Sequence, residues 1–313
     1  MIRRMGIQPD DSVMIHASMK SIGNVEGGAD TVLDAWMEYL SEGLFMMPAH
    51  TWAQMGPDCR VFDPQSMPSC VGLLTNLFRM RPGVVRSLHP THSIAAYGKG
   101  AKDYIAGEET VDTPCHPDGC WGRLENIGAK ILLIGVGHER NTFIHSVEES
   151  MKVPERLTDE PSEFFIRQAD GSLLPRPVYR HYNKNEPHIS EHYPKLSPAL
   201  EACGAARHVS FGDADCILCD ARKTASVTRR ILSHEKTCLL ERDVIPREWW
   251  REDYPSRPTR FVRIPISSIS QATSSPGFKN LGGSNPIPTP DGVPVEITVP
   301  AFSVIPLESS LII

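Results

Sequence analysis

The first 150 residues alternate short apolar runs with segments of helical periodicity. Ser12–Ala17 (SVMIHA) and residues 44–49 (LFMMPA) have the length and composition of strands. Between them, apolar residues recur at helical spacing from about Asp30 to Leu40, which predicts a βαβ unit. A second helix is predicted from Ser69, as its N-cap, through Met80, where the sequence RPG ends it.

Further strands are predicted at residues 93–98 (SIAAYG) and 130–137 (KILLIGVG). The second of these is almost continuously apolar, which is typical of a strand covered on both faces. Residues 175–187 suggest an edge strand and hairpin, and residues 213–232 suggest a strand followed by a helix. The pattern predicts an α/β fold with a mixed sheet flanked by helices.

The character of the sequence changes past about residue 233. Residues 264–313 are rich in Pro, Ser and Gly and contain only short β-prone runs. We therefore expect one main domain over residues 1–240, followed by an irregular or β C-terminal extension over residues 241–313.

Composition narrows the class of protein. The chain has 313 residues, of which 40% are hydrophobic and 22% charged, as in ordinary globular proteins. No window approaches 18 uninterrupted apolar residues, and the first residues turn polar at once, so we expect a cytoplasmic protein that does not enter a membrane. The formal net charge of -6 disfavours a nucleic-acid partner and would suit a cationic one.

Residues 131–150, ILLIGVGHERNTFIHSVEES, begin as a buried strand and continue as a helix. In open α/β sheets the ligand crevice lies beyond the carboxyl ends of the strands, where the loop GHERN would lie. His145 would fall in the first helical turn, with Asn141 or Thr142 as the cap. The positive end of the helix dipole disfavours imidazolium there, so the ring would stay neutral.

Two acidic residues follow His145 at helical spacing. Glu148 stands at i+3 and Glu149 at i+4, so one of them can share the face of the histidine. A neutral imidazole beside a carboxylate suits proton abstraction from an amine, a hydroxyl or water. Spacing alone leaves a second interpretation open, in which His145 only caps or packs the helix.

Five segments appear in the same order as in the aminoglycoside 3-N-acetyltransferase family, the antibiotic N-acetyltransferases that use acetyl-CoA. The chain resembles this family over roughly residues 5 to 235. The segments are VMIHASMKSIGNVEGGADTVLDAW, LFMMPAHT, FDPQSMPS, FRMRPGVVRSLHPTHSIAAYG and ILLIGVGHERNTFIHSVEES.

The resemblance implies direct acetyl transfer from acetyl-CoA, as co-substrate, to the 3-amino group of an aminoglycoside. It assigns the catalytic base to His145 and a supporting role to Glu148. The residues that it implies for CoA lie in the first βα connection and the HPTHS loop: Ser18, Lys20, Ser21, Gly27, Gly28, His89 and Ser93.

For the acceptor, the resemblance implies a polyamine sugar held by carboxylates. Asp63 is a candidate, as is the acidic segment 102–119, although such loops are more often simply solvated. Three further candidates rest on their placement in the sequence: His50, Glu191 and His192.

The chain departs from the family pattern near the expected acceptor region. Many members carry a glutamate where this chain has Asn76, and many read SPLARL where Gly119–Leu124 reads GCWGRL. Two alternatives therefore remain: the same fold and cofactor with a different small amine, such as a biosynthetic intermediate, or a non-catalytic protein that binds CoA or another ligand. A homodimer is also compatible with the sequence.

Cysteines offer a further alternative. Cys216 and Cys219 form a CxxC in a predicted strand, where residues three apart point to opposite faces and cannot chelate one ion. The spacing of Cys115 and Cys120 around a histidine lacks a second ligand pair, so we expect no metal. Either Cys115 or Cys120 could instead be an acylated nucleophile activated by His145, which would give ping-pong kinetics.

Overall fold

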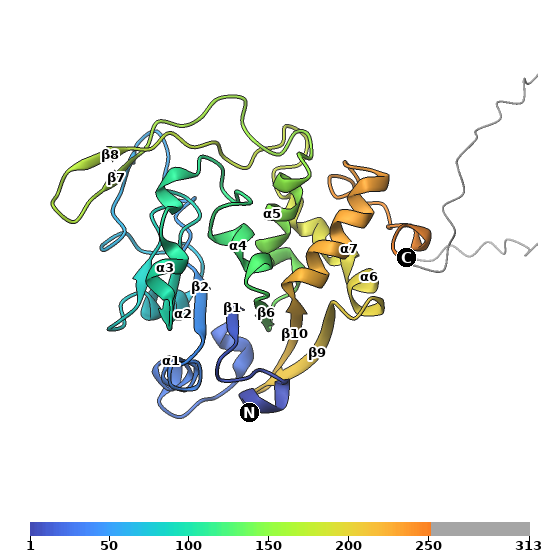
Figure 1. Ribbon diagram of the computed structural model, residues 1–313, viewed down its shortest axis with the longest axis horizontal. Helices are drawn as coiled ribbons and strands as arrows, with labels where there is room; N and C mark the ends of the chain where they lie inside the picture. Colours follow the sequence, from blue (N-terminus) through green and yellow to red (C-terminus); the bar gives the residue numbers. More distant parts are fainter. Residues whose placement is uncertain (252–313) are drawn as a thin grey trace, which may run out of the picture. The chain divides into compact units, whose positions relative to one another are not determined.

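A seven-stranded mixed sheet organises the protein in the computed structural model, which describes residues 1–251 (Figure 1). Its strand order is β4-β5-β2-β1-β6-β10-β9, and a separate three-stranded sheet has the order β3-β7-β8. The strands are β1 (Ser12–Ala17), β2 (Leu44–Pro48), β3 (Val61–Phe62), β4 (Val85–Arg86), β5 (Ile94–Gly98), β6 (Lys130–Ile134), β7 (Phe165–Arg167), β8 (Leu173–Pro175), β9 (Ala206–Phe211) and β10 (Ala214–Asp220).

The centre of the large sheet is parallel. Strand β1 pairs in parallel with β2, where Val13 lies opposite Phe45, and with β6, where Val13 lies opposite Lys130. Helix α1 connects β1 to β2, so the predicted βαβ unit is confirmed. The carboxyl ends of these three strands meet at one edge of the sheet, which is where open α/β sheets bind ligands.

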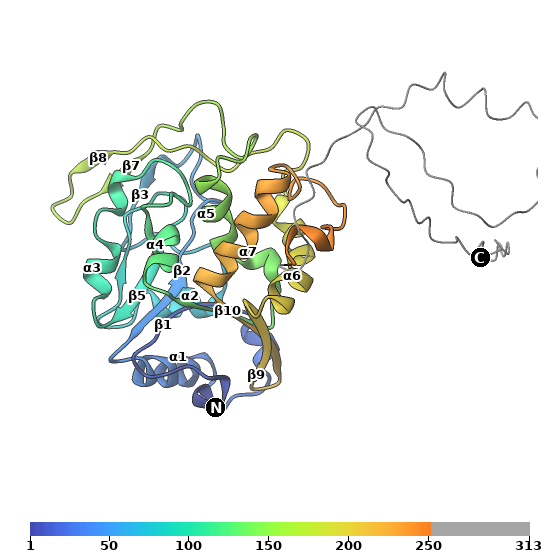
Figure 2. The same cartoon turned by 45° about the vertical axis from the view of Figure 1, so that its right-hand side comes forward.

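Helices cover both faces of the large sheet (Figures 1 and 2). One core cluster packs helices α1 and α2 against the sheet, and the other packs α3 to α7. The helices are α1 (Gly28–Tyr39), α2 (Leu73–Phe78), α3 (Ala101–Ile105), α4 (Cys120–Asn126), α5 (Phe143–Ser150), α6 (Ser197–Ala202) and α7 (Ala221–His234). Short 3-10 helices are η1 (Ile2–Met5), η2 (Met19–Ile22), η3 (Glu108–Thr110), η4 (His138–Arg140), η5 (Ile189–Leu196) and η6 (Arg247–Trp249).

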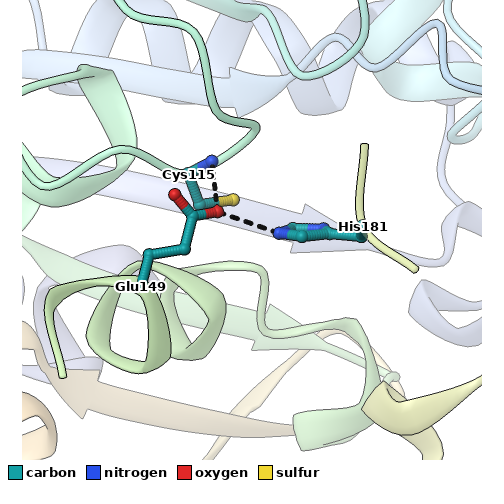
Figure 3. Close-up of side chains that lie close together, drawn as sticks. All are labelled: Cys115, Glu149 and His181. Carbon is teal, nitrogen blue, oxygen red and sulfur yellow. Dashed lines mark hydrogen bonds and ion pairs between the residues drawn. The ribbon is translucent and has the colours of Figure 1, made fainter. Parts of the chain in front are cut away.

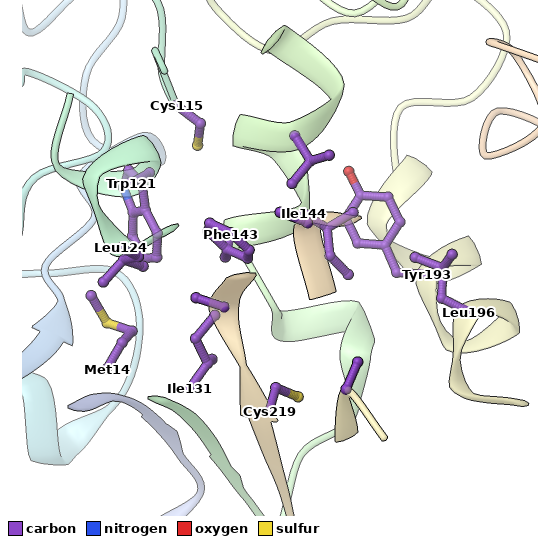
Figure 4. Packing of buried hydrophobic residues seen from close by; sticks show 14 of the residues in the cluster. Met14, Cys115, Trp121, Leu124, Ile131, Phe143, Ile144, Tyr193, Leu196 and Cys219 are labelled. Atoms are coloured by element: carbon purple, nitrogen blue, oxygen red, sulfur yellow. The ribbon is translucent and has the colours of Figure 1, made fainter. Parts of the chain in front are cut away.

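Successive side chains along a strand point to opposite faces of the sheet and pack into different core clusters. Met14 of β1 packs with Trp121, Phe143 and Ile144 in the larger cluster (Figure 4), whereas Val13 packs in the cluster below α1. The α/β fold predicted from the alternation of strands and helices is therefore confirmed, and the near-continuous apolar run of β6 is buried on both faces.

Strand β10 confirms the interpretation of the CxxC sequence. Cys216 belongs to the core cluster on one side of the sheet and Cys219 to the cluster on the other. The two thiols point to opposite faces, so they cannot share an ion. All eight cysteines are free thiols.

Helix α2 is shorter than the predicted helix over residues 69–80. Gly72 precedes it with φ 91° and ψ 161°, a conformation that favours glycine and is not helical. The backbone of Ser69 is instead held by the side chain of Asn76, which accepts from its N–H and donates to its carbonyl oxygen. The predicted N-cap is thus part of a loop folded back onto the helix.

The predicted boundary at residue 240 stays a prediction. Ile245 and Trp250 are buried and belong to the larger core cluster, so the chain remains packed on this unit as far as residue 250. The predicted irregular or β segment 264–313 lies outside the described residues. Over residues 1–251, no helix has the length and apolar character needed to cross a bilayer.

Candidate active site

A cavity of about 610 Å³ lies at the carboxyl ends of the parallel strands. His16 and Ala17 contribute from the end of β1, Pro48 from the end of β2, and Val136 from the loop after β6. The strand topology predicts a ligand crevice at this edge, and the cavity occupies it.

His145 lines this cavity from the first turn of α5. Thr142 is the N-cap, as the sequence suggested, but its side chain makes no capping hydrogen bond. The Nδ1 atom of His145 faces the protein, 2.5 Å from Tyr193 Oη, 2.8 Å from Arg156 Nη2 and 3.3 Å from Glu148 Oε2. No described residue hydrogen-bonds to its Nε2 atom, so this nitrogen is available to a ligand in the cavity.

Glu148 is fully buried beneath the histidine and is held by two partners. Arg156 donates to Glu148 Oε2 from Nη2 at 2.9 Å and from Nε at 3.1 Å, and the Tyr193 hydroxyl donates to the same oxygen. Burial by itself would raise the pKa of this carboxyl group, but the charge of Arg156 and the hydrogen bonds lower it to about 2. Glu148 is therefore an anion throughout the physiological pH range.

His145 is neutral at neutral pH. Burial lowers its pKa below 6.5, the nearby charge of Arg156 lowers it further, and the hydrogen bond and charge of Glu148 oppose both effects only in part. Because the Tyr193 hydroxyl donates to Glu148, its oxygen can accept a proton from His145 Nδ1. Two acceptors, Tyr193 Oη and Glu148 Oε2, favour a proton on Nδ1, whereas the donor Arg156 Nη2, 2.8 Å from Nδ1, favours a proton on Nε2. The two hydrogens of Nη2 have other acceptors in Glu148 Oε2 and Tyr193 Oη, so we expect the tautomer in which Nε2 carries the lone pair.

Histidine rings continue along the cavity wall. The ring centroids of His50 and His92 lie 4.7 Å apart, those of His92 and His181 5.0 Å, and those of His181 and His145 4.3 Å. Burial lowers the pKa of each of these rings, so the histidine part of the wall is polar but uncharged at neutral pH. Trp121, from the GCWGRL segment, packs against His50 and donates its indole N–H to the His92 carbonyl oxygen.

The residues predicted for CoA in the first βα loop lie outside the cavity wall. The wall includes Ala17, the residue immediately before this loop. Helix α1 begins here, and its N-cap glycine has φ 74°, a left-handed conformation suited to glycine. These residues, whose role in cofactor binding stays a prediction, are Ser18, Lys20, Ser21, Gly27 and Gly28.

The two residues predicted for CoA in the HPTHS loop are buried within the fold. His89 accepts hydrogen bonds from the backbone N–H groups of Thr91 and His92 through Nδ1, and Ser93 donates to the carbonyl oxygen of Ala49. Thr91 and His92 line the cavity, whereas His89 and Ser93 do not. The observed contacts of His89 and Ser93 thus shape the loop that forms the wall.

Of the four residues predicted to bind the acceptor, two line the cavity and two lie outside its wall. His50 and Glu191 line the cavity, and Glu191 forms an ion pair with Arg140 at 3.4 Å. Asp63 lies outside the wall, where it accepts hydrogen bonds from a following turn and pairs with an arginine of β7. His192 is also outside the wall and bonds to the carbonyl oxygen of Leu239.

The acidic segment 102–119 contributes to the framework. Glu108 is buried and accepts a hydrogen bond from the backbone N–H of Cys120 at 2.5 Å. Both Cys115 and Cys120 are buried outside the cavity wall, and burial raises the pKa of each thiol. This environment disfavours the thiolate that an acylated nucleophile requires.

Sequence reasoning missed three residues that complete the site: Arg156, Tyr193 and His181. Arg156 and His181 lie in irregular segments without periodicity, and Tyr193 lies in a 3-10 helix 48 residues after His145. The two consecutive glutamates were the available signal for a second histidine, because Glu148 binds His145 and Glu149 binds His181.

Comparisons with known proteins agree with this architecture. The family model described as aminoglycoside 3-N-acetyltransferase matches residues 14–233. Aminoglycoside N(3)-acetyltransferase VII of Streptomyces paromomycinus is 29% identical over 245 residues, which cover 70% of this chain and 84% of that protein.

Solved structures of similar fold include aminoglycoside acetyltransferase AAC(3)-IVa in complex with a gentamicin. Its TM-score is 0.66 at 25% identity, and the match covers 77% of this chain and 88% of that one. AAC-IIIb bound to CoASH has a TM-score of 0.65 at 21% identity, over 74% of this chain and 93% of that one, a likeness of fold. The family match spans more than two thirds of the sequence and includes the helix that carries His145, and the chain therefore belongs to the aminoglycoside 3-N-acetyltransferase family of acyltransferases.

Proposed function

We propose that the protein transfers the acetyl group of acetyl-CoA directly to the 3-amino group of an aminoglycoside, with His145 as general base. The observation that carries this proposal is the setting of His145: the ring lies in the cavity wall, Tyr193, Arg156 and Glu148 surround Nδ1, no described residue bonds to Nε2, and burial lowers the pKa of the ring. A positioned base of this kind contributes about a hundredfold to ten-thousandfold in rate. Membership of the family and the CoA complex of the structural neighbour AAC-IIIb support the choice of acetyl donor.

In the proposed reaction, the acceptor nitrogen attacks the thioester carbonyl while His145 Nε2 removes one of its protons. The C–N bond forms, the C–S bond breaks, and the proton held by His145 passes to the sulfur, so that CoA leaves as a thiol. The imidazolium that forms transiently is stabilised by Glu148, which stays ionised because Arg156 neutralises its buried charge.

Acidic residues of the cavity wall support a cationic acceptor. Glu139, Glu186 and Glu191 contribute carboxylates to it. Glu139 accepts only a backbone N–H, from Gly137, and pairs with no lysine or arginine within residues 1–251. An aminoglycoside ammonium could therefore pair with Glu139 without displacing a cation of the protein.

Two arginines of the cavity wall favour a second candidate for the acceptor, an amine with fewer positive charges than an aminoglycoside. Arg140 and Arg180 also line the cavity, and the guanidinium group of Arg180 bonds only to the backbone carbonyl oxygens of Met55 and Trp52. A cationic group near Arg180 would be repelled, and a carboxylate or hydroxyl of the acceptor would be attracted. The same chemistry at His145 would then serve a different small amine.

Release of the free CoA thiol from acetyl-CoA tests both candidates. The acceptors are aminoglycosides found on structural neighbours, namely gentamicin, apramycin and sisomicin, together with simple amines, and mass spectrometry identifies the product. We expect turnover of an aminoglycoside by the wild type and a loss of at least about a hundredfold in kcat for His145→Gln. Acetylation of simple amines alone would support the second candidate, and silence with every amine would contradict both.

The control is His208→Gln on strand β9. This histidine is exposed, pairs with Asp215 and lies outside the cavity wall. It should keep wild-type activity, and undiminished turnover by His145→Gln would refute the assignment of the base.

A further inference from the structure

A second histidine–glutamate pair lies beside His145 in the wall of the cavity. Glu149 is on α5, and its Oε1 atom is 3.0 Å from His181 Nε2 and accepts the backbone N–H of Cys115 at 2.9 Å (Figure 3). Its other oxygen accepts the hydroxyl of Thr113 at 2.5 Å. The carboxylate is therefore held at both oxygens, and it fixes the ring of His181 in turn.

The contact with Glu149 determines which nitrogen of His181 carries the proton. A carboxylate accepts hydrogen bonds, so Nε2 donates its N–H to Oε1, and the lone pair of the neutral ring is then on Nδ1. Burial, and then the neighbouring His145, lower the pKa of His181 to about 4, so the ring is neutral at neutral pH.

The Nδ1 atom of His181 is an unused hydrogen-bond acceptor. Within residues 1–251, no residue hydrogen-bonds to it, and it is not among the unpartnered polar atoms that the fold encloses. The ring lines the cavity. A ligand in the cavity can therefore donate a hydrogen bond to this nitrogen without displacing a partner within the protein.

Two such acceptors lie close together in the wall. His145 presents Nε2 to the cavity, and the centroids of its ring and that of His181 are 4.3 Å apart. The two N–H bonds of a primary amine diverge at roughly the tetrahedral angle, so their two acceptors lie about 5 Å apart when each hydrogen bond is about 3.0 Å long. The separation of the rings is close to this value and suits the two N–H groups of one nitrogen.

We propose that His181, held by Glu149, binds the N–H that a primary amine keeps, while His145 takes the proton of the other N–H. The acceptor reacts as the free amine, R–NH₂, whose ammonium form has already lost a proton to water. Its lone pair is then left for the thioester carbonyl. The C–N bond forms, the C–S bond breaks, the proton passes from His145 to the sulfur, and the hydrogen held by His181 remains as the N–H of the acetamide.

No proton is transferred to His181 at any step, so its role is to orient the nucleophile and to select it. A secondary amine has a single N–H, which His145 requires, and its alkyl group would then face His181 Nδ1. Desolvating this acceptor without a partner should cost about tenfold or more in kcat/KM. The inference thus narrows the substrate class to primary amines, and it rests on the proposed acetyl transfer.

The test is the ratio of kcat/KM for a primary amine to kcat/KM for its N-methyl derivative. The primary amine is gentamicin, apramycin, sisomicin or a simple amine, whichever the wild type acetylates, and the derivative carries one methyl group on the nitrogen that mass spectrometry identifies as acetylated. A loss of folded protein lowers both rates equally, so the ratio reports on the site alone.

Two variants separate the two nitrogens of His181. In His181→Gln, the longer side chain can still donate an amide N–H to Glu149, but the acceptor at Nδ1 is gone. In His181→Asn, the shorter side chain can place an amide oxygen near the position of Nδ1, but the donor to Glu149 is lost. The control is His208→Gln, on the exposed surface of β9.

His181→Gln should lower kcat/KM for the primary amine about tenfold and leave that for the N-methyl derivative unchanged, so that the ratio falls about tenfold. His181→Asn should keep more of the ratio than His181→Gln, and His208→Gln should keep all of it. The KM for acetyl-CoA should be the same in all four proteins.

Three results would overturn the inference while leaving the proposed function intact. The first is an equal loss for both amines in His181→Gln, which would mean a merely structural role. The second is a ratio that falls only because the N-methyl derivative reacts faster, which would mean steric exclusion by the ring. The third is a wild type that acetylates both amines equally well. Silence of the wild type with every amine would instead overturn the proposed function, and this inference with it.

Discussion

Removing the charge of Glu148 should destabilise the fold strongly as well as the active site. In Glu148→Gln, the Arg156 guanidinium, whose side chain is 5% exposed, keeps its charge but loses its buried anion. Breaking a buried ion pair by removing one partner typically costs about 3–5 kcal/mol. The lowering of the Glu148 pKa from 4.5 to about 2 gives a similar value, roughly 3 kcal/mol at neutral pH.

The pH dependence follows from the sign of this shift. Because the pKa is lower in the folded state, the stabilisation is fully present above about pH 4.5 and is lost as the pH falls toward 2. Urea unfolding at pH 7 should therefore show a loss of about 3 kcal/mol in the free energy of unfolding for Glu148→Gln, and the difference from the wild type should shrink below pH 4.5.

A matched double variant separates the charge from the packing. Glu148→Gln combined with Arg156→Met removes both members of the pair, so no unpaired charge stays buried, and most of the lost stability should return. A loss below about 1 kcal/mol in the single variant, or a double variant less stable than the single one, would refute the view that this buried pair stabilises the fold around His145.

Three further predictions concern the proposed reaction. Tyr193→Phe removes the hydroxyl between His145 and Glu148, and kcat should fall about tenfold, the equivalent of one lost hydrogen bond, with the KM for acetyl-CoA unchanged; an unaltered kcat would contradict the role of Tyr193. Iodoacetamide should not alkylate Cys115 or Cys120 in the native enzyme, because both are buried, and double-reciprocal plots should intersect; parallel lines would indicate an acyl-enzyme. Lys20→Ala should raise the KM for acetyl-CoA severalfold at low salt and less at high salt without changing kcat, and a KM equal to that of the wild type would place CoA away from this loop.

The sequence predicted the elements whose pattern is local. The apolar runs of β1, β2 and β6 and the helical spacing in α1 were sufficient for the βαβ unit. The spacing after His145 predicted that Glu148 or Glu149 would share its face, and the structure brings Glu148 to its ring. The opposite faces of Cys216 and Cys219 likewise follow from the period of a strand.

Contacts between distant segments were beyond local patterns. Tyr193 reaches His145 across 48 residues from the 3-10 helix η5, and His181 reaches Glu149 across 32 residues from an irregular segment. Helix α2 was predicted too long because the loop around Ser69 is stabilised by side-chain hydrogen bonds from Asn76, which local propensity does not register. Asp63 was predicted to bind the acceptor, but its carboxylate accepts hydrogen bonds from the backbone of the turn that follows it, which its charge did not indicate.

The central claim is that the ring of His145 is uncharged and presents an unprotonated Nε2 to the cavity. Nitrogen NMR of the full chain labelled with ¹⁵N-histidine measures this directly, with His145→Gln identifying the signal. The account predicts a proton on Nδ1, none on Nε2 at pH 7, and a pKa below 6.5. A proton on Nε2 at pH 7, as in a ring whose Nδ1 accepts from Arg156 or in an imidazolium, would contradict it.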